Sequence, residues 1–174
     1  VEDSGATTTL AYADGVHLTS LTVASGSPQA IAYDALGRTA AVTEGATTTA
    51  YAFAGTGETV VAVTQGADTR SSLVDATGSR LAWTTGGATA FTLFDHLGSL
   101  VALVGTGPAN PLAEVYRYSG FGEPLADTAQ AGQEDPGGRR NPFRFRGALN
   151  LGSDAEPLYE MGARLYAPSL GAWT

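Results

Sequence analysis

The sequence has no cysteine, no lysine and little charge. Because none of its 174 residues is cysteine, disulfides and thiolate metal sites are excluded. Its two histidines, His17 and His96, make a poor metal site without cysteine, and no cofactor is expected. Charged residues make up 15% and apolar residues 43%, which excludes a disordered acidic chain, because disorder requires low hydrophobicity. The sequence has no run of eighteen apolar residues, so no membrane span is predicted.

The few charges are unevenly distributed. Residues 1–138 carry four Arg and fourteen acidic residues, whereas residues 139–174 carry five Arg and three acidic residues. The acidic first part argues against a nucleic-acid partner, because affinity for phosphates needs basic contacts. A basic cluster near the end comprises Arg139, Arg140, Arg144 and Arg146. It could contact an anion, but pairing with nearby carboxylates is the favoured interpretation. A start at Val1, without a signal peptide, favours a piece of a longer protein.

A six-residue pattern with glycine as its fifth residue recurs along the chain, and three of its five copies have Asp as the second residue. Its copies are YDALGR from Tyr33, FAGTGE from Phe53, VDATGS from Val74, FDHLGS from Phe94 and YSGFGE from Tyr118. An earlier YADG at Tyr12 is interpreted as a decayed copy. Asp followed by Gly at this spacing favours the ends of a type I turn, in which the Asp side chain accepts backbone N–H groups. Each glycine is expected to take a left-handed conformation that closes a hairpin with a bulge.

A second set of glycines lies between these turns, so each unit of about twenty residues has two turns and two strands. The segment 47–53 alternates aromatic and β-branched residues with small ones, which is typical of a strand. Residues 100–104 are apolar on both faces and predict a strand covered on both sides. Residues 156–164 could form one helical turn or a short strand, and residues 126–140 an exposed loop. The pattern predicts an all-β fold, an antiparallel meander of hairpins that must stack to bury their apolar faces.

These motifs carry a family resemblance. YDALGR resembles the YD repeat of the Rhs/YD-repeat family. DHLGS, YRYSGFGEPLA, NPFRFRG and LYEMGARLYAPSLGAW, in that order, resemble the Rhs repeat-associated core. The resemblance divides the chain into degenerate YD repeats at 1–90 and a core-like closing segment at 91–174. The sequence departs from the core pattern at Ser119 and Gly120, where Asp-Pro is usual, at Ala167, where Asp is usual, and at Ala172, where Arg is usual.

The resemblance implies a curved sheet that is part of a spiralling β-shell. In bacterial members such a shell encloses a toxin before delivery, and in animal relatives a similar barrel serves adhesion. It implies a secreted or cell-surface, non-catalytic scaffold whose partner is the remainder of a parent chain or an enclosed toxin domain. The resemblance places the family's Asp-Pro motifs for self-cleavage after the last core block, beyond Thr174, so this chain is not expected to be the autoprotease. Alternatives are an adhesin or carbohydrate-binding module with a glycan partner, and a module that self-assembles through its sheet edges.

Residue types that could support catalysis were weighed against structural roles. Asp95, His96 and Ser99 would share one tight turn without room for a substrate, so a turn is favoured over a triad. Paired carboxylates at Asp154, Glu156 and Glu160 are too close in sequence for a glycosidase site. No catalytic or metal-binding residue is therefore predicted. Four aromatic residues could stack on sugars but more often form a sheet core: Tyr116, Tyr118, Phe143 and Phe145.

Two sets of residues are predicted to matter structurally. The turn residues are Asp34, Gly37, Gly57, Asp75, Gly78, Asp95, Gly98 and Gly122. The closing-segment residues are Phe143, Phe145, Gly147, Tyr159, Arg164, Tyr166, Pro168 and Gly171. Within the second set, Arg164 is expected to be a buried or stacked anchor, because Tyr159 and Tyr166 are close to it in sequence and can receive a cation.

Overall fold

A computed structural model describes residues 8–22, 27–106, 114–125, 141–152, 157–162 and 164–173. By the density of its internal contacts the chain divides into two units, residues 1–67 and 68–174. The resemblance begins elsewhere, at residue 91, so the division predicted from the motifs stays a prediction. Each unit is described separately below.

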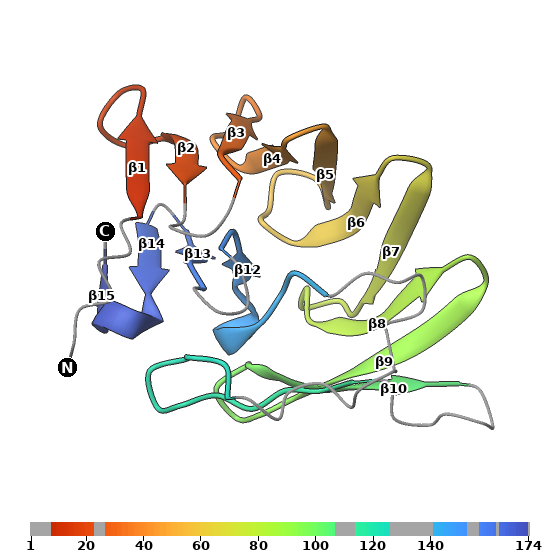
Figure 1. Cartoon of the computed structure of the whole chain (residues 1–174). Coiled ribbons are helices and arrows are strands. Elements are labelled where there is room, and N and C mark those ends of the chain that lie inside the picture. Colours follow the sequence, from red (N-terminus) through yellow and green to blue (C-terminus); the bar gives the residue numbers. More distant parts are fainter. Residues whose placement is uncertain are drawn as a thin grey trace. The chain divides into compact units, whose positions relative to one another are not determined.

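The first unit is a meander of six strands, coloured red to yellow in Figure 1. The strands are β1 (Thr9–Tyr12), β2 (Leu18–Thr22), β3 (Gln29–Tyr33), β4 (Thr39–Glu44), β5 (Thr47–Phe53) and β6 (Val60–Gln65). Each strand pairs with the next along the chain in antiparallel orientation.

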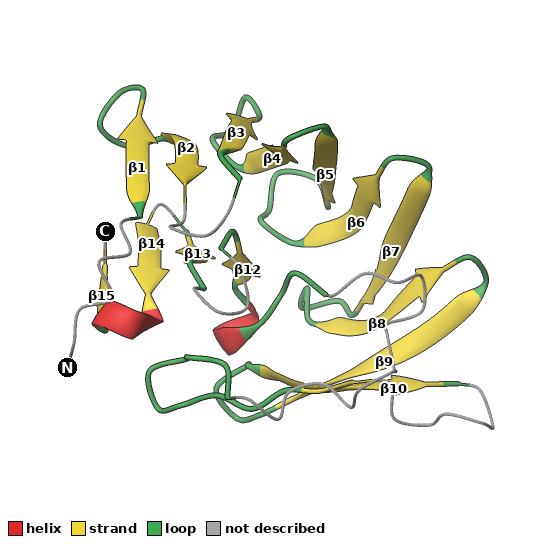
Figure 2. Cartoon of the chain, in the orientation of Figure 1, coloured by secondary structure: helices red, strands yellow, loops and turns green. Residues whose placement is uncertain are grey.

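The second unit continues with β7 (Asp68–Val74), β8 (Arg80–Thr85), β9 (Ala88–Phe94), β10 (Leu100–Gly105) and the short β11 (Glu114–Val115). A separate four-stranded sheet follows, formed by β12 (Leu149–Asn150), β13 (Tyr159–Met161), β14 (Arg164–Ala167) and β15 (Ala172–Trp173). Two single helical turns, Phe145–Gly147 and Pro168–Leu170, are drawn in red in Figure 2. The prediction of an all-β antiparallel meander is confirmed.

Bulges recur at one end of the hairpins. The pairing register shifts between Ala32 and Tyr33, between Ala52 and Phe53, and between Leu73 and Val74. In each case the shift comes directly before a turn of the repeat. A bulge bends its strand and increases the local twist, so the repeated shift explains the curvature of these hairpins, which the resemblance implied.

The two faces of the sheets differ in composition. In the first unit Leu18, Leu21, Ile31, Val60 and Val63 are buried. The opposite face of β3 to β5 carries small exposed residues such as Ala32, Ala50 and Ala52. In the second unit the core is larger and more aromatic; it includes Trp83, Leu100, Leu103, Tyr116, Phe143, Leu149 and Tyr159. The closing segment therefore packs against one face of the strands β7 to β11.

Several local predictions are resolved by these strands. Residues 100–104 are buried or half-buried throughout. Of the two options for residues 156–164, the strand is the one observed, as β13 and the start of β14. The predicted loop at 126–140 lies outside the described residues. Among the described residues, no helix has the length and hydrophobicity that a membrane crossing requires.

Candidate functional site

Asp95 and Gly98 end a tight turn between β9 and β10. The Asp95 N–H donates to the Ser99 carbonyl at 2.9 Å, and the Gly98 N–H donates to the Asp95 carbonyl at 3.1 Å. The Asp95 carboxylate accepts the N–H groups of Leu97 and Ser99 at 2.9 and 2.8 Å. Gly98 has φ +81°, a conformation that L side chains rarely adopt. The carboxylate is therefore occupied by its own turn, and His96 is exposed beside it.

The turns at Asp34 and Asp75 repeat this arrangement. Each Asp accepts backbone N–H groups two and four residues later. The pKa of Asp34 is lowered chiefly by the Arg38 side chain, and the pKa of Asp75 chiefly by the Thr77 hydroxyl. Hydrogen bonds to a carboxylate favour its charged form, so these turns hold their Asp residues ionised.

The turn from Ala54 to Thr59 differs from the prediction. Its closing hydrogen bond joins the Ala54 N–H to the Thr59 carbonyl, which makes the loop one residue longer than the one at Asp34. The positive φ lies at Gly55 and not at Gly57. Gly57 was therefore wrongly predicted to be left-handed, because the extra residue moves the strained position toward the start of the loop.

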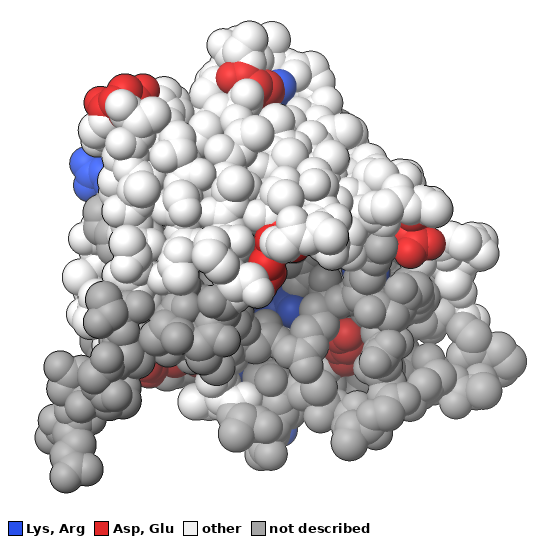
Figure 3. All heavy atoms as spheres, turned by 45° about the horizontal axis from the view of Figure 1, so that its top comes forward, with Lys and Arg blue, Asp and Glu red and all other residues white. Residues whose placement is uncertain are grey.

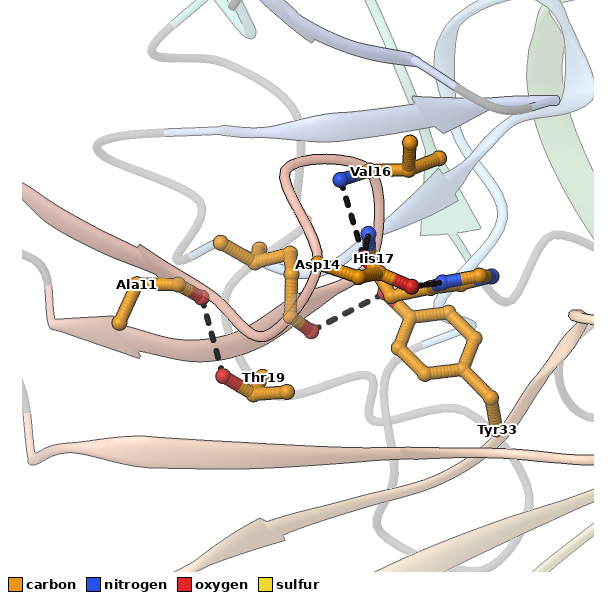
Figure 4. Close-up of polar contacts among 7 residues, drawn as sticks. Ala11, Asp14, Val16, His17, Thr19 and Tyr33 are labelled. Atoms are coloured by element: carbon orange, nitrogen blue, oxygen red, sulfur yellow. Dashed lines mark hydrogen bonds and ion pairs between the residues drawn. The ribbon is translucent and has the colours of Figure 1, made fainter.

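The first turn is a variant in which the acidic residue is displaced by one position. Figure 4 shows the Asp14 carboxylate accepting the backbone N–H groups of Val16 and His17 at 3.0 and 2.8 Å. A further 2.6 Å contact joins Asp14 Oδ2 to His17 Nδ1. The His17 backbone N–H is the largest cause of the lowered pKa of Asp14. The YADG segment is thus a turn of the same kind, in which Asp14 accepts backbone N–H groups from a position one residue later than that of Asp34.

Successive turns of the first unit are linked by a basic residue and an aromatic residue. The His17 ring packs edge-on against Tyr33 with centroids 4.9 Å apart. The Arg38 guanidinium lies 4.2 Å from the centroid of Phe53 and donates to the carbonyls of Gly55 and Gly57. In both cases the basic residue that ends one turn stacks on the aromatic residue that precedes the next, which couples neighbouring repeats.

The closing segment contains a turn of the same kind that the sequence reasoning missed. The Arg144 N–H donates to the Ala148 carbonyl at 2.9 Å, and the Gly147 N–H donates to the Arg144 carbonyl at 3.1 Å. Gly147 has φ +68°, and Arg146 is also left-handed at φ +54°. The segment FRFRGA therefore matches YDALGR in its backbone, with Arg144 in the place of Asp34. The sequence signal for this turn is the spacing of Phe143 and Gly147, which equals that of Tyr33 and Gly37.

This turn docks on the turn at Asp95 from far away in the sequence. The Leu100 N–H donates to the Arg144 carbonyl at 3.2 Å. The Ser99 hydroxyl accepts the Arg146 N–H at 3.1 Å. Ser99 is fully buried there, so its hydroxyl is the acceptor that satisfies a backbone group of the left-handed residue.

A third turn, residues 119–123, meets the same place. A Cβ added at Gly122 would lie 2.5 Å from Cδ1 of Phe145, so the ring occupies the space that a side chain would need. The Tyr159 hydroxyl donates to the Gly122 carbonyl at 3.0 Å, and the Tyr166 hydroxyl donates to the Phe121 carbonyl at 2.9 Å. We call the meeting of turns 95–99, 119–123 and 144–148 the three-turn junction.

Aromatic rings and one buried cation surround the junction. Phe145 lies 5.8 Å from Tyr118 and 6.0 Å from Tyr159, in tilted contacts between ring centroids. Burial raises the pKa of both tyrosines well above the ordinary value, so both hydroxyls stay protonated. The Arg144 guanidinium, itself buried, lies 4.5 Å from the centroid of Tyr116. The junction is a packed structural site without an ionised phenol or a free nucleophile.

The remaining closing-segment residues fall outside the junction. Phe143 is buried and stacks on Trp83 with centroids 5.9 Å apart. Pro168 is buried and begins a helical turn that Gly171 ends at φ +59°. The prediction for Arg164 is wrong: this residue is exposed at the start of β14, which turns Leu165 and Ala167 to the core. The arginines that stack on aromatic rings are Arg38, Arg80 and Arg144.

The structure also places the other candidates for chemistry. Within the described ranges, no group of three or more His, Asp or Glu residues is gathered as a metal site would be. Asp154, Glu156, Arg139 and Arg140 lie outside the described residues, and Glu160 is half-buried on β13. Tyr116 and Phe143 are buried, and Tyr118 and Phe145 are half-buried, so they form core rather than an exposed sugar platform. On the face shown in Figure 3, the described charged side chains are few and scattered.

Comparisons with known proteins agree on the fold. No family model and no curated protein matches the chain. Solved structures do. A crystal structure of TcdB2-TccC3 has a TM-score of 0.64 at 13% identity, and one without the hypervariable C-terminal region has 0.67 at 13%. Both are covered over 9% of their length, and each match includes 95% of this chain.

A Tc holotoxin pore of Photorhabdus luminescens is similar as well, with a TM-score of 0.65 at 12% identity over 95% of this chain and 8% of that one. The chain has an Rhs-like β-fold. It spans less than a tenth of the chains that it resembles, and identities this low support the fold and not a particular subfamily.

Proposed function

We propose that the chain is a non-catalytic section of an Rhs-type β-shell that encloses and helps to deliver a toxin domain of a longer, secreted protein. The three-turn junction carries this proposal. It joins turns that are far apart in sequence and commits buried aromatic residues, a buried Ser99 and backbone groups to packing alone. The similarity in fold to the TcdB2-TccC3 structures supports the same role.

The proposed partners are therefore the remainder of the parent chain and its enclosed domain. In this reading the turn-to-turn links of the first unit hold successive hairpins together, and the junction fixes the last hairpin to the closing segment. Neither task needs an ionisable nucleophile, which agrees with the use of Asp34, Asp75 and Asp95 as turn acceptors.

Limited proteolysis of the parent protein tests the proposal. A domain enclosed by the shell resists a nonspecific protease in the wild type and is cut rapidly in a Gly122→Leu variant, because the new side chain collides with Phe145. A Leu97→Ala variant, altered at an exposed turn position, is the control and should stay protected. Equal cleavage of the non-repeat domains in all three proteins would contradict enclosure.

A second candidate function is self-association through a sheet edge. The strand β15 lies at the edge of its sheet, and Trp173 on it is 52% exposed beside an exposed Leu170. Unpaired edges with apolar side chains favour pairing with another chain. Light scattering decides: a Trp173→Lys variant should reduce the mass of any assembly, and a monomeric wild type would exclude this function.

A further inference from the structure

Two arginines follow turns of the same kind but stand one position apart. Arg38 comes directly after Gly37, whereas Ser79 separates Arg80 from Gly78. Arg38 is therefore close to the carboxylate of its own turn and contacts Asp34 through Nε at 2.7 Å and through a terminal nitrogen at 2.6 Å. The two turns have the same length, so Ser79 takes the place of Arg38 and Arg80 is the first residue of β8.

The carboxylate of Asp75 is already occupied. It accepts the N–H and the hydroxyl of Thr77 at 2.8 and 2.6 Å, and the N–H of Ser79 at 2.9 Å. Among the described residues, no carboxylate lies within ion-pair distance of Arg80. Arg80 is thus a cation without a counter-charge in the part of the chain that the structure describes.

The Arg80 side chain is nonetheless held in a fixed position. Its Nε donates to the Ser72 hydroxyl at 2.9 Å. Its guanidinium carbon lies 3.8 Å from the ring centroid of Phe143 and 4.8 Å from that of Trp83. Burial lowers the pKa of Arg80 to about 10, which still leaves the guanidinium protonated at neutral pH. A fixed, desolvated guanidinium whose terminal nitrogens have no carboxylate is prepared to receive an anion.

Two other buried donors of the second unit have no hydrogen-bond partner. Trp83 is 2% exposed, and its Nε1 has no hydrogen-bond partner. Asn141, two residues before Phe143, is fully buried, and its Nδ2 is also without a partner. Buried donors without partners are costly, and an oxygen-bearing ligand would satisfy such groups.

We propose that Arg80, with Trp83 beside it, forms a binding site for a carboxylate, which the guanidinium holds through its two terminal nitrogens. A carboxylate is planar and singly charged, so it matches the planar guanidinium and its single charge. A phosphate dianion would bring a second negative charge that no further described contact of Arg80 neutralises. The site does not depend on the shell role proposed above.

Fluorescence of Trp83 tests the proposal in a Trp173→Phe background, where Trp83 is the remaining tryptophan. Sodium acetate should change the emission in a saturable manner at constant ionic strength, whereas chloride should not. Arg80→Met, which keeps the aliphatic stem, should weaken the response at least about tenfold, and Arg80→Lys should weaken it less. Arg38→Met is the matched control and should leave the response unchanged, since Arg38 already has Asp34.

The source of the carboxylate is separated by a second titration. A blocked tripeptide Gly-Glu-Gly that binds more tightly than acetate indicates an acidic side chain of a protein segment, and equal affinities indicate a free small anion. Circular dichroism shows whether Arg80→Met folds. If it does not, the site is tested by the ion selectivity of the Trp173→Phe protein and by the acetate response of the Arg80→Lys variant. Equal responses to acetate and chloride, or a response to phosphate at lower concentration than to acetate, would overturn the site.

Discussion

The same kind of turn makes local contacts in the first unit and a long-range contact in the second. In the first unit the turns that end at His17 and Arg38 each reach the next turn along the chain, through His17 on Tyr33 and Arg38 on Phe53. In the second unit the turn at Asp95 is bound by a segment 47 residues later, through Ser99 and Arg146. The closing hydrogen bond of the turn is alike in both units, but the residue that accepts it makes a local side-chain contact at His17 and Arg38 and a distant one at Ser99.

Rigidity has a different origin in the two units. Local links couple neighbours but leave the ends of a meander open, because each contact spans one repeat. A distant contact closes a long loop of chain and depends on the packing of several elements at once. We therefore expect substitutions at the three-turn junction to cost more than equivalent substitutions at turns of the first unit.

The largest effect is expected for Gly122→Ala. The new Cβ would lie 2.5 Å from Phe145, at a residue with φ +93°, so overpacking adds to backbone strain. The free energy of unfolding of the second unit should fall by about 3 kcal/mol, measured from hydrogen exchange of the β9 and β10 amides. Gly98→Ala is the matched control: it has a similar φ but nothing within 4 Å of the added atom, and should cost about 1 kcal/mol. Equal losses would contradict the role given to Phe145.

Ser99→Ala should have the next largest effect. It leaves the Arg146 N–H without its acceptor at a fully buried site, which should cost about 1–2 kcal/mol. Ser79 holds the same position in the preceding turn of this kind but is exposed, so Ser79→Ala should change stability by less than about 0.5 kcal/mol. Chemical denaturation of the two variants measures the difference. A cost at Ser79 as large as at Ser99 would show that the turn, and not the docked segment, needs the hydroxyl.

How far the sequence predicts this molecule depends on the range of the interactions. The turns at Asp34, Asp75 and Asp95 are readable because their hydrogen bonds lie within five residues. Gly57 was misassigned because a loop longer by one residue moves the left-handed position to Gly55.

The contacts of the closing segment depend on tertiary packing instead. The fit of Phe145 over Gly122 joins two turns that only the folded chain brings together. Arg164 was judged by its neighbours in sequence, whereas the face of its strand decides its exposure. The turn at Arg144 was within reach of sequence reasoning, but the missing Asp hid it, because the backbone of the turn is kept when its first side chain is not an acceptor.

A smaller effect is expected from Arg38→Met in the first unit. The variant loses the ion pair with Asp34, two hydrogen bonds to carbonyls and the stack on Phe53, in a half-buried position where water partly replaces them. Hydrogen exchange of the β5 and β6 amides should report a loss of about 1 kcal/mol. Arg164→Met removes an exposed charge of the same type and should leave the protection of both units unchanged. A loss that spreads uniformly through both units would argue against a link between neighbouring turns.

The smallest effect at neutral pH, and the most specific one in acid, is expected from the double variant Asp34→Asn and Asp75→Asn. Asparagine oxygens still accept the backbone N–H groups of the turns, so at pH 7 the variant should lose only the part of each contact that depends on charge, including the Asp34–Arg38 ion pair. In the wild type the folded pKa of each Asp is lowered. Their contribution is therefore present above the ordinary Asp pKa of 3.8 and is lost as the pH falls through the folded pKa. Thermal melts between about pH 5 and pH 2 should show a shallower decline in the variant than in the wild type. Glu44→Gln, at an exposed position of β4, serves as the control for a change in net charge. Parallel declines in all three proteins would mean that acid acts elsewhere than on the turns.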